Sequence, residues 1–164
     1  MPRTRPDKEN SAPSSKRRRI LRIAVIAVAA IAIYYVNIEV QTRLGRKAIA
    51  ETGLQSLPLD EALRVASVSD KTVLVNVSAV WCPSCRALDR EVFSDARVAE
   101  AIRTSHVYSR LEYESAEATA FLRERDTRGF PNLWLLDAGG RPLRRIEYTL
   151  DATAFLQSLL QGES

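Results

Sequence analysis

Both cysteines of this chain lie in one five-residue stretch, WCPSC at residues 81–85, directly after the run TVLVNVSAV at residues 72–80. A short β-branched run of this kind predicts a buried strand. Pro83 suits the first turn of a helix, because its ring fixes φ and it lacks an N–H that would be unpaired there. The thiols therefore mark a strand-to-helix junction, where they could form a structural disulfide, half of a metal site, a haem attachment point or a redox couple.

The number of available ligands argues against two of these roles. A zinc site takes about four ligands, and the two cysteines together with His106, the single histidine of the chain, are too few. Haem attachment needs a histidine directly after the second cysteine, where this chain has Arg86. We therefore expect neither a metal ion nor haem. With one histidine, a serine hydrolase is not expected either.

The remaining choice is between a structural and a redox-active disulfide. A structural disulfide stabilises most when it closes a long loop, and this pair closes a very short one. Cys82 precedes a helix, where unpaired N–H groups and the positive end of the helix dipole favour a thiolate. Cys85 lies one turn later on the same face and is placed to resolve a mixed disulfide. The pattern favours a redox couple that needs no cofactor besides its own disulfide.

A second feature is the apolar run at residues 20–38, whose only charge is Arg22 near its start. As a helix it would be about 28 Å long, close to the ~30 Å core of a bilayer. Tyr34 and Tyr35 lie toward its far end, as interfacial aromatic residues often do. This predicts a transmembrane helix in contact with lipid. A buried core helix and a cleaved signal peptide, for which residues 30–32 (AIA) offer a small-x-small site, are the alternatives.

Charge is uneven along the chain. Residues 1–22 carry eight Lys/Arg and two Asp/Glu, a balance of +6, whereas the remaining residues carry 16 Lys/Arg and 18 Asp/Glu, a balance of −2. The basic side of a span stays in the cytoplasm. We therefore expect a single-pass inner-membrane protein with a cytoplasmic N-terminus and a periplasmic or otherwise extracytoplasmic C-terminal domain, where disulfides can persist. Because that domain is slightly acidic, nucleic-acid binding is not expected.

Composition and periodicity divide the chain into four segments. We expect a disordered basic tail at 1–19, the transmembrane helix at 20–38, a helical extension or linker at 39–52, and a folded domain at 53–164. In the domain, the predicted strands are 53–57, 72–80, 106–113, 131–138 and 142–148. The predicted helices are 58–70, 83–103 with a break near 93–95, 115–126 and 151–161. The Gly139-Gly140 hairpin before the last strand excludes a purely parallel sheet, so we expect an α/β fold with a mixed sheet and helices on both faces.

Three stretches of this sequence resemble thioredoxin-fold thiol:disulfide oxidoreductases. VLVNVSAVWCPSC resembles their strand and active-site turn, and RGFPNLWLLDAGGRPL resembles their later strand pair. More narrowly, VWCPSCRALDREVFSDARVAEAI resembles the C-terminal thioredoxin-like domain of the DsbD family of thiol:disulfide interchange proteins. The likeness covers about residues 55–160. It implies a thioredoxin-like fold and thiol–disulfide exchange with protein substrates.

The resemblance also implies roles for individual residues. Cys82 would be the nucleophile and Cys85 the resolving thiol, with Trp81 shielding both. Pro131 would be the cis-proline that shapes a groove opposite the dithiol, and the backbone of Phe130 would pair with an extended substrate segment. Pro83 and Ser84, the two residues between the thiols, would help to set the reduction potential.

Two further positions differ from the family pattern, and a third matches an acid for which two roles are open. Asn76 stands where the family often has a buried acid that relays protons, and an amide cannot titrate. Asp89 corresponds to a second acid of DsbD-like domains, and it is either a proton relay or simply a solvated helix residue. Tyr148 stands where a glycine is common and would narrow the groove.

Together these features predict a membrane-anchored protein-disulfide reductase supplied with electrons by a separate membrane protein. Cytochrome c maturation is one process that uses such a reductase. The alternatives are a disulfide oxidase or isomerase with the same dithiol, and a binding or holdase module whose groove holds partners without turnover.

Overall fold

The computed structural model describes residues 15–161, so most of the predicted tail lies outside the described residues. The contacts within the chain divide it into two compact units, Met1–Asn37 and Ile38–Ser164.

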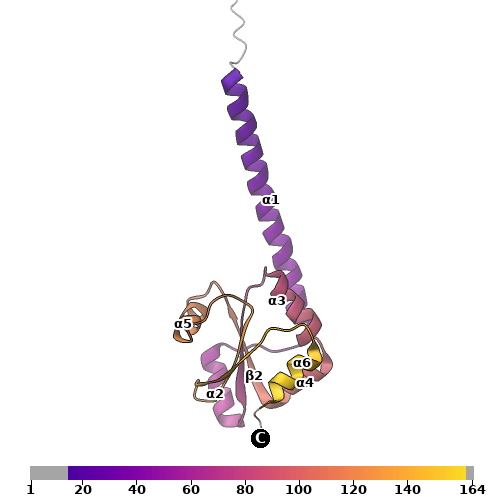
Figure 1. Ribbon diagram of the computed structural model, residues 1–164, viewed down its shortest axis with the longest axis vertical. Coiled ribbons are helices and arrows are strands. Elements are labelled where there is room, and N and C mark those ends of the chain that lie inside the picture. Colours follow the sequence, from indigo (N-terminus) through magenta and orange to yellow (C-terminus); the bar gives the residue numbers. More distant parts are fainter. Residues whose placement is uncertain (1–14, 162–164) are drawn as a thin grey trace, which may run out of the picture. The chain divides into compact units, whose positions relative to one another are not determined.

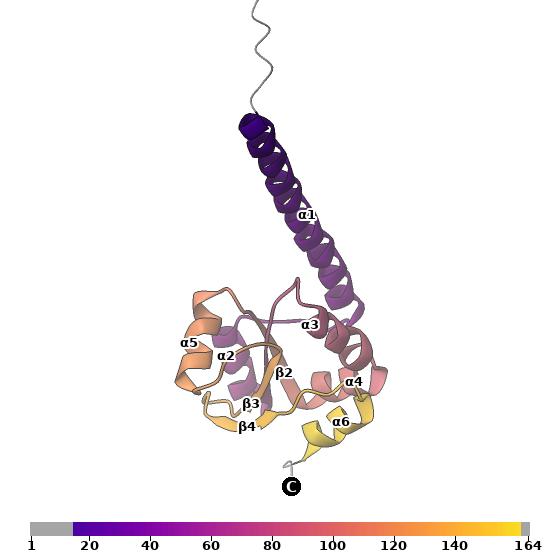
Figure 2. The same cartoon turned by 45° about the horizontal axis from the view of Figure 1, so that its top comes forward.

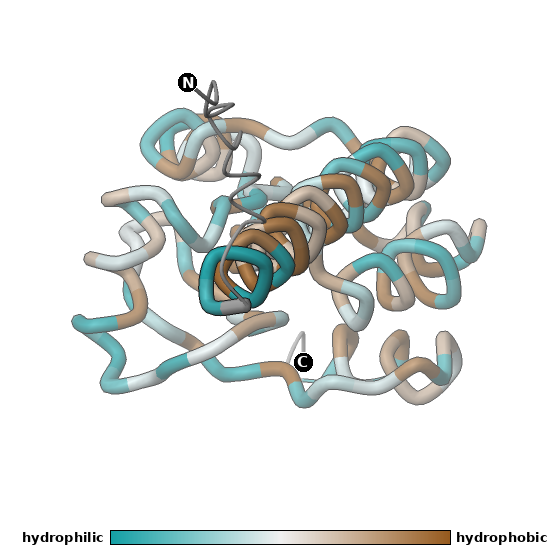
Figure 3. Tube along the Cα trace, turned by 90° about the horizontal axis from the view of Figure 1, so that it is seen from above, coloured by the Kyte–Doolittle hydropathy of each residue, from teal (hydrophilic) through white to brown (hydrophobic). Residues whose placement is uncertain are grey.

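The first unit contains the beginning of helix α1 (Ser15–Glu51). Within the described residues, this is the one helix long and apolar enough to cross a membrane. Its most apolar 18-residue window has no buried share, which is unlike a helix in a protein core. In Figure 3 the apolar turns of α1 are brown and its basic start is teal. Residues 15–19, predicted to be disordered, are the first helical turn, because Lys and Arg are good helix formers and extending an existing helix needs no new nucleus.

The second unit begins at Ile38, inside α1. Residues 39–51, which the sequence left open as a helical extension or linker, are helical, and Thr52 follows as a turn. Gly45 and Ala48 on this part of the helix are buried against the folded domain. The domain therefore includes residues that the sequence analysis placed before its boundary at residue 53.

A four-stranded mixed sheet with the order β2-β1-β3-β4 forms the centre of this unit. β1 (Thr72–Ser78) pairs in parallel with β2 (His106–Glu112) and antiparallel with β3 (Asn132–Leu136). β3 continues through the Gly139-Gly140 turn into antiparallel β4 (Pro142–Ile146), with an irregularity in the register at the end of β3. The predicted α/β fold with a mixed sheet is confirmed.

Helices cover both faces of the sheet (Figures 1 and 2). One face is covered by α2 (Leu59–Ser69) and α5 (Ala116–Glu124). The other is covered by α3 (Pro83–Leu88), the π-helical turn η1 (Asp89–Phe93), α4 (Ala96–Ser105) and α6 (Ala152–Leu160). The predicted break near residues 93–95 is present, with Asp95 capping α4 through the N–H of Arg97.

The alternation of side chains along β1 decides what lies beneath the cysteines. Val73, Val75 and Val77 point into the core under α2 and α5. Leu74 packs in the opposite core with α3, α4 and α6. Because successive strand residues point to opposite faces, Asn76 and Ser78 lie on the same face as Leu74. These two polar side chains are fully buried on the α3 side of the sheet.

The predicted first strand at 53–57 is wrong. The segment runs beside β2 but makes only one backbone hydrogen bond to it, from the N–H of Leu57 to the carbonyl of Tyr108 at 3.0 Å. The hydroxyl of Ser56 occupies the other contact by accepting from the N–H of Arg110 at 2.8 Å. A side chain thus replaces the backbone acceptor that a strand would supply, so no ladder forms.

Candidate redox site

The two cysteines lie at the N-terminus of α3, directly after the turn that ends β1. Cys82 is the N-cap residue and Pro83 opens the helix, as the sequence predicted. The N–H of Cys82 donates to the carbonyl of Ala79 at 3.0 Å, which holds the turn. The N–H of Cys85 donates to the Sγ of Cys82 at 3.2 Å. The first turn of the helix therefore supplies a hydrogen-bond donor to the sulfur of the predicted nucleophile.

Both thiols are unpaired with each other and nearly inaccessible, with 3% of Cys82 and 1% of Cys85 exposed. The hydroxyl of Ser84 lies 3.4 Å from the Sγ of Cys82. Burial raises the pKa of Cys85 to about 12, with a further contribution from Cys82. The Ser78 hydroxyl and the Ala79 backbone act in the opposite direction. Cys85 is therefore held as a neutral thiol, as expected of a residue that acts second.

Three aromatic side chains cover the thiols. Trp81 and Phe130 meet edge to face with 5.4 Å between ring centroids, and Tyr113 lies 4.3 Å from Phe130. The indole N–H of Trp81 donates to the Oε1 of Glu114 at 2.7 Å. The Phe130–Pro131 peptide bond is cis, the geometry that the resemblance implied. Trp81, Phe130 and Tyr113 pack against both cysteines and Ala79 as one cluster.

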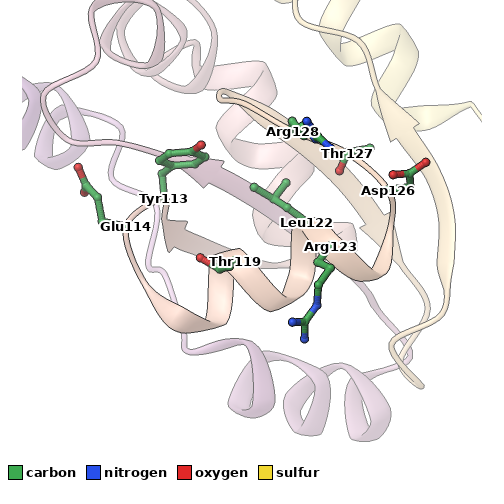
Figure 4. Close-up of a pocket in the computed structure, with 8 residues that line it drawn as sticks. All are labelled: Tyr113, Glu114, Thr119, Leu122, Arg123, Asp126, Thr127 and Arg128. Atoms are coloured by element: carbon green, nitrogen blue, oxygen red, sulfur yellow. The ribbon is translucent and has the colours of Figure 1, made fainter.

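A pocket of about 570 Å³ lies next to this cluster (Figure 4). It opens between α5 and the loop that follows it, and its lining is mixed in charge and polarity. The lining residues are Tyr113, Glu114, Thr119, Leu122, Arg123, Asp126, Thr127 and Arg128. Tyr113 belongs both to this pocket and to the aromatic cover, and Glu114 lines the pocket and accepts the hydrogen bond from Trp81, so the pocket adjoins the surroundings of the dithiol.

A group of buried, hydrogen-bonded polar side chains lies beneath α3. The side-chain amide of Asn76 donates to the hydroxyl of Tyr108 at 2.9 Å. Burial raises the pKa of Tyr108 to about 12, and the guanidinium of Arg110 opposes this shift. Asn76 thus takes part in a hydrogen bond with a group that stays protonated. Tyr108 and Arg110 were not predicted, although their spacing on one face of an alternating strand was a visible signal.

Asp89 is not a solvated residue, and that alternative is wrong. The π-helical turn places its carboxylate 2% exposed against Arg110, whose Nη1 donates to both oxygens at 3.1 and 3.2 Å. Burial raises the pKa of Asp89, and Arg110 acts against that rise. Arg110 also contacts Glu112, whose second oxygen accepts from the N–H of Val80 at 3.2 Å. The ion pair is therefore connected to the turn that carries the dithiol.

Tyr148, at the position where a glycine is common, is 44% exposed. Partial burial raises the pKa of its phenol, with smaller contributions from Cys82 and Cys85. His106 lies at the start of β2, bonded to the Thr72 hydroxyl at 2.5 Å, and packs away from the dithiol cluster. Among residues 15–161, no group of three His, Cys, Asp or Glu side chains is arranged to hold a metal ion.

A thioredoxin-like family model matches residues 54–138, just over half of the chain. The chain therefore belongs to the thioredoxin-like family, whose fold serves thiol–disulfide oxidoreductases. It is 30% identical over 116 residues to the thiol:disulfide interchange protein DsbD of Yersinia enterocolitica, a match covering 69% of this chain and 20% of that relative. The chain thus corresponds to about a fifth of that relative's length.

Solved structures agree with this assignment. A putative disulphide-isomerase from Bacteroides thetaiotaomicron is similar with a TM-score of 0.58 and 25% identity, covering 68% of this chain and 94% of that one. A thioredoxin from Thermus thermophilus gives a TM-score of 0.58 at 24% identity, covering 65% of this chain and 84% of that one. The second likeness concerns the fold alone.

Proposed function

We propose that this chain is a membrane-anchored thiol:disulfide oxidoreductase that reduces disulfides in proteins outside the cytoplasm. The observation that carries the proposal is the 3.2 Å hydrogen bond from the N–H of Cys85 to the Sγ of Cys82 at the start of α3. A donor in this position would stabilise the thiolate form of Cys82, which is the form that attacks disulfides.

The reaction takes place in two exchanges. The Cys82 thiolate attacks one sulfur of a substrate disulfide, forming an intermolecular S–S bond and releasing the other substrate sulfur as a thiolate. Cys85 then loses its proton and attacks the Sγ of Cys82. The second substrate sulfur leaves as a thiolate and takes up a proton, and the Cys82–Cys85 disulfide forms. Two electrons pass from the dithiol to the substrate, and the dithiol of a separate membrane donor restores the reduced pair.

The substrate would be a polypeptide in an extended conformation beside Phe130 and Pro131. The aromatic cover of Trp81, Phe130 and Tyr113 supports this, because it offers an apolar surface at the thiols. The adjoining pocket, lined partly by Tyr113, is wide enough for a side chain of that segment. Recognition by backbone pairing plus one pocket suits an enzyme with several protein substrates.

The membrane anchor and its orientation are part of the same proposal. The long apolar helix α1 and the excess of basic residues before it support a span whose N-terminal side is cytoplasmic. Resistance of the protein to extraction from membranes by alkaline carbonate tests the anchor. The intact mass of the mature protein tests whether the segment is retained or cleaved as a signal peptide.

The direction of electron flow is tested by the reduction potential of the Cys82–Cys85 pair. The full chain is purified in detergent and equilibrated with glutathione or dithiothreitol redox buffers. A potential near that of thioredoxin, about −270 mV, supports a reductase. A potential near about −120 mV, as in DsbA, contradicts it and makes the protein a disulfide donor. Cellular function that survives Cys82→Ala would instead favour the holdase alternative.

A further inference from the structure

One residue of α1 makes an unusually close approach to the turn that carries the dithiol. Gly45 lies in the interior of the helix, where glycine is less favourable than alanine, so its presence needs a structural reason. A Cβ atom at this position would lie 1.8 Å from the carbonyl oxygen of Val80. Backbone atoms do not yield easily to such a clash. Only glycine at position 45 lets the helix and the turn pack at this distance.

Neighbouring residues on the same helix face make related contacts. Gln41, one turn before Gly45, accepts a hydrogen bond from the Nη1 of Arg86. Ala48, close to one turn after it, is 1% exposed. Positions spaced by three and four residues share one face of a helix. We name the surface formed by Gln41, Gly45 and Ala48 the helix seat.

The helix seat touches the chain on both sides of the dithiol. Val80 precedes Cys82 by two residues, and Arg86 directly follows Cys85. Val80 is also held through its N–H, which donates to Glu112 at 3.2 Å. The turn is therefore held between the end of β2 and the helix seat. The hydrogen bond from Cys85 to Cys82 spans the chain between these two contacts.

We propose that Gly45 and Gln41 are positioning residues for the redox pair, acting through Val80 and Arg86. They hold the turn and the first turn of α3 so that the N–H of Cys85 stays directed at the Sγ of Cys82. Residues 38–51 are then part of the redox site and not a connecting linker. The inference rests on the proposed function, because it concerns the reduction potential of the same pair.

The test measures the glutathione equilibrium of the full chain in detergent, in which the dithiol and one glutathione disulfide yield the protein disulfide and two glutathione thiols. In Gly45→Ala the displaced turn weakens the Cys85-to-Cys82 hydrogen bond, which stabilises the reduced form. We expect the equilibrium to move at least threefold toward the protein disulfide, about 14 mV at ~30 mV per tenfold change. The control Ala50→Leu adds bulk to an exposed position of the same helix and leaves the equilibrium unchanged.

A second pair of variants covers the case in which Gly45→Ala does not fold. Gln41→Leu removes the acceptor for Arg86 and moves the equilibrium in the same direction. Gln41→Glu keeps an acceptor and stays within twofold of the wild type. The melting temperature is measured alongside, because a purely structural role lowers stability without changing the equilibrium of the folded protein.

The outcomes separate this inference from the proposed function. A wild-type protein that forms no disulfide with glutathione contradicts the proposed function itself. A wild-type protein that equilibrates normally, with variants that lose stability but keep its equilibrium constant, overturns the inference alone. Shifts in Gly45→Ala and Gln41→Leu, with Ala50→Leu and Gln41→Glu unchanged, establish the helix seat.

Discussion

The backbone N–H of Cys85 points at the sulfur of Cys82, so the residue proposed to resolve the mixed disulfide donates a hydrogen bond to the proposed nucleophile. The same residue supplies a hydrogen-bond donor from its backbone and, later in the reaction, an attacking sulfur from its side chain. The bond is made by the backbone, so it survives substitution of the Cys85 side chain. This separation makes the two roles of Cys85 accessible to mutation.

The first prediction concerns trapping of substrates. In Cys85→Ala the N–H donor remains and Cys82 still attacks, but no thiol is present to release the product. We expect stable mixed disulfides between Cys82 and substrate proteins, seen as bands on a non-reducing gel that disappear with dithiothreitol. Cys82→Ala is the matched control and should form none. Equal trapping by the two variants would contradict the assigned order of the cysteines.

The second prediction concerns the pH dependence of the release step. Burial raises the pKa of Cys85 to about 12, so its thiolate fraction increases about tenfold per pH unit throughout the range from pH 6 to 9. The release of a small thiol from a preformed Cys82 mixed disulfide should become faster in the same proportion. Stopped-flow single-turnover measurements give the slope. A rate that levels off below about pH 8 would contradict the prediction, because Cys85 would then already be a thiolate in the mixed disulfide.

The third prediction concerns the buried ion pair between Asp89 and Arg110. In Arg110→Leu, the carboxylate of Asp89 is buried without its partner, a change that typically costs about 3–5 kcal/mol of stability. The double variant Asp89→Leu/Arg110→Leu should recover most of that loss. Denaturant unfolding in detergent measures the wild type, Asp89→Leu, Arg110→Leu and the double variant. If the double variant is as unstable as the sum of the single variants, the two side chains do not act as a pair.

The loss of folding stability in Arg110→Leu should also depend on pH. Without Arg110 the pKa of Asp89 rises further above its ordinary value, since burial is then unopposed. At low pH, an acid whose pKa is raised in the folded protein is neutral in both the folded and the unfolded states. As the pH rises, the acid ionises more readily in the unfolded chain than in the folded protein, so stability falls. The variant should therefore be closer to the wild type at pH 4 than at pH 7.

The fourth prediction concerns His106, whose pKa is lowered to about 4 by burial and by the positive charges of Arg144 and Lys71. Below pH 6.5 the unfolded chain takes up a proton that the folded protein does not, so stability falls as the pH decreases toward 4. The full loss of stability between pH 6.5 and pH 4 amounts to roughly 3 kcal/mol. Unfolding at pH 7 and pH 4.5 should show a smaller loss in His106→Asn than in the wild type. Equal losses would mean that His106 is protonated in the folded state.

Local patterns were enough to predict most of the fold. The β-branched run before Cys82, the Gly139-Gly140 turn and the helix predicted at 151–161 each depend on neighbouring residues, and each element formed within a few residues of its predicted bounds. The strand expected at 53–57 failed because its pairing depended on β2, far along the chain. There the Ser56 hydroxyl took the place of a backbone acceptor.

The candidate site was predictable where it is continuous in sequence and not where it is assembled by the fold. Residues 81–85 carry their geometry with them, since a proline and an N-cap position specify the helix start. The partners of Asn76 and Asp89 come from β2, and their identity depends on the register of the β1–β2 pair. The contact between Gly45 and Val80 joins segments 35 residues apart, and its only local signal is a glycine inside a helix.

The near-complete burial of both cysteines affects how fast the pair reacts but not its redox equilibrium. Small oxidants and free thiols must pass the aromatic cover to reach two residues that are 3% and 1% exposed, so we expect them to react slowly. A protein partner that docks on Trp81 and Phe130 can displace this cover by its own binding. Under the proposed function, the pair therefore exchanges electrons faster with docked proteins than with small thiols, while its equilibrium with glutathione is unaffected.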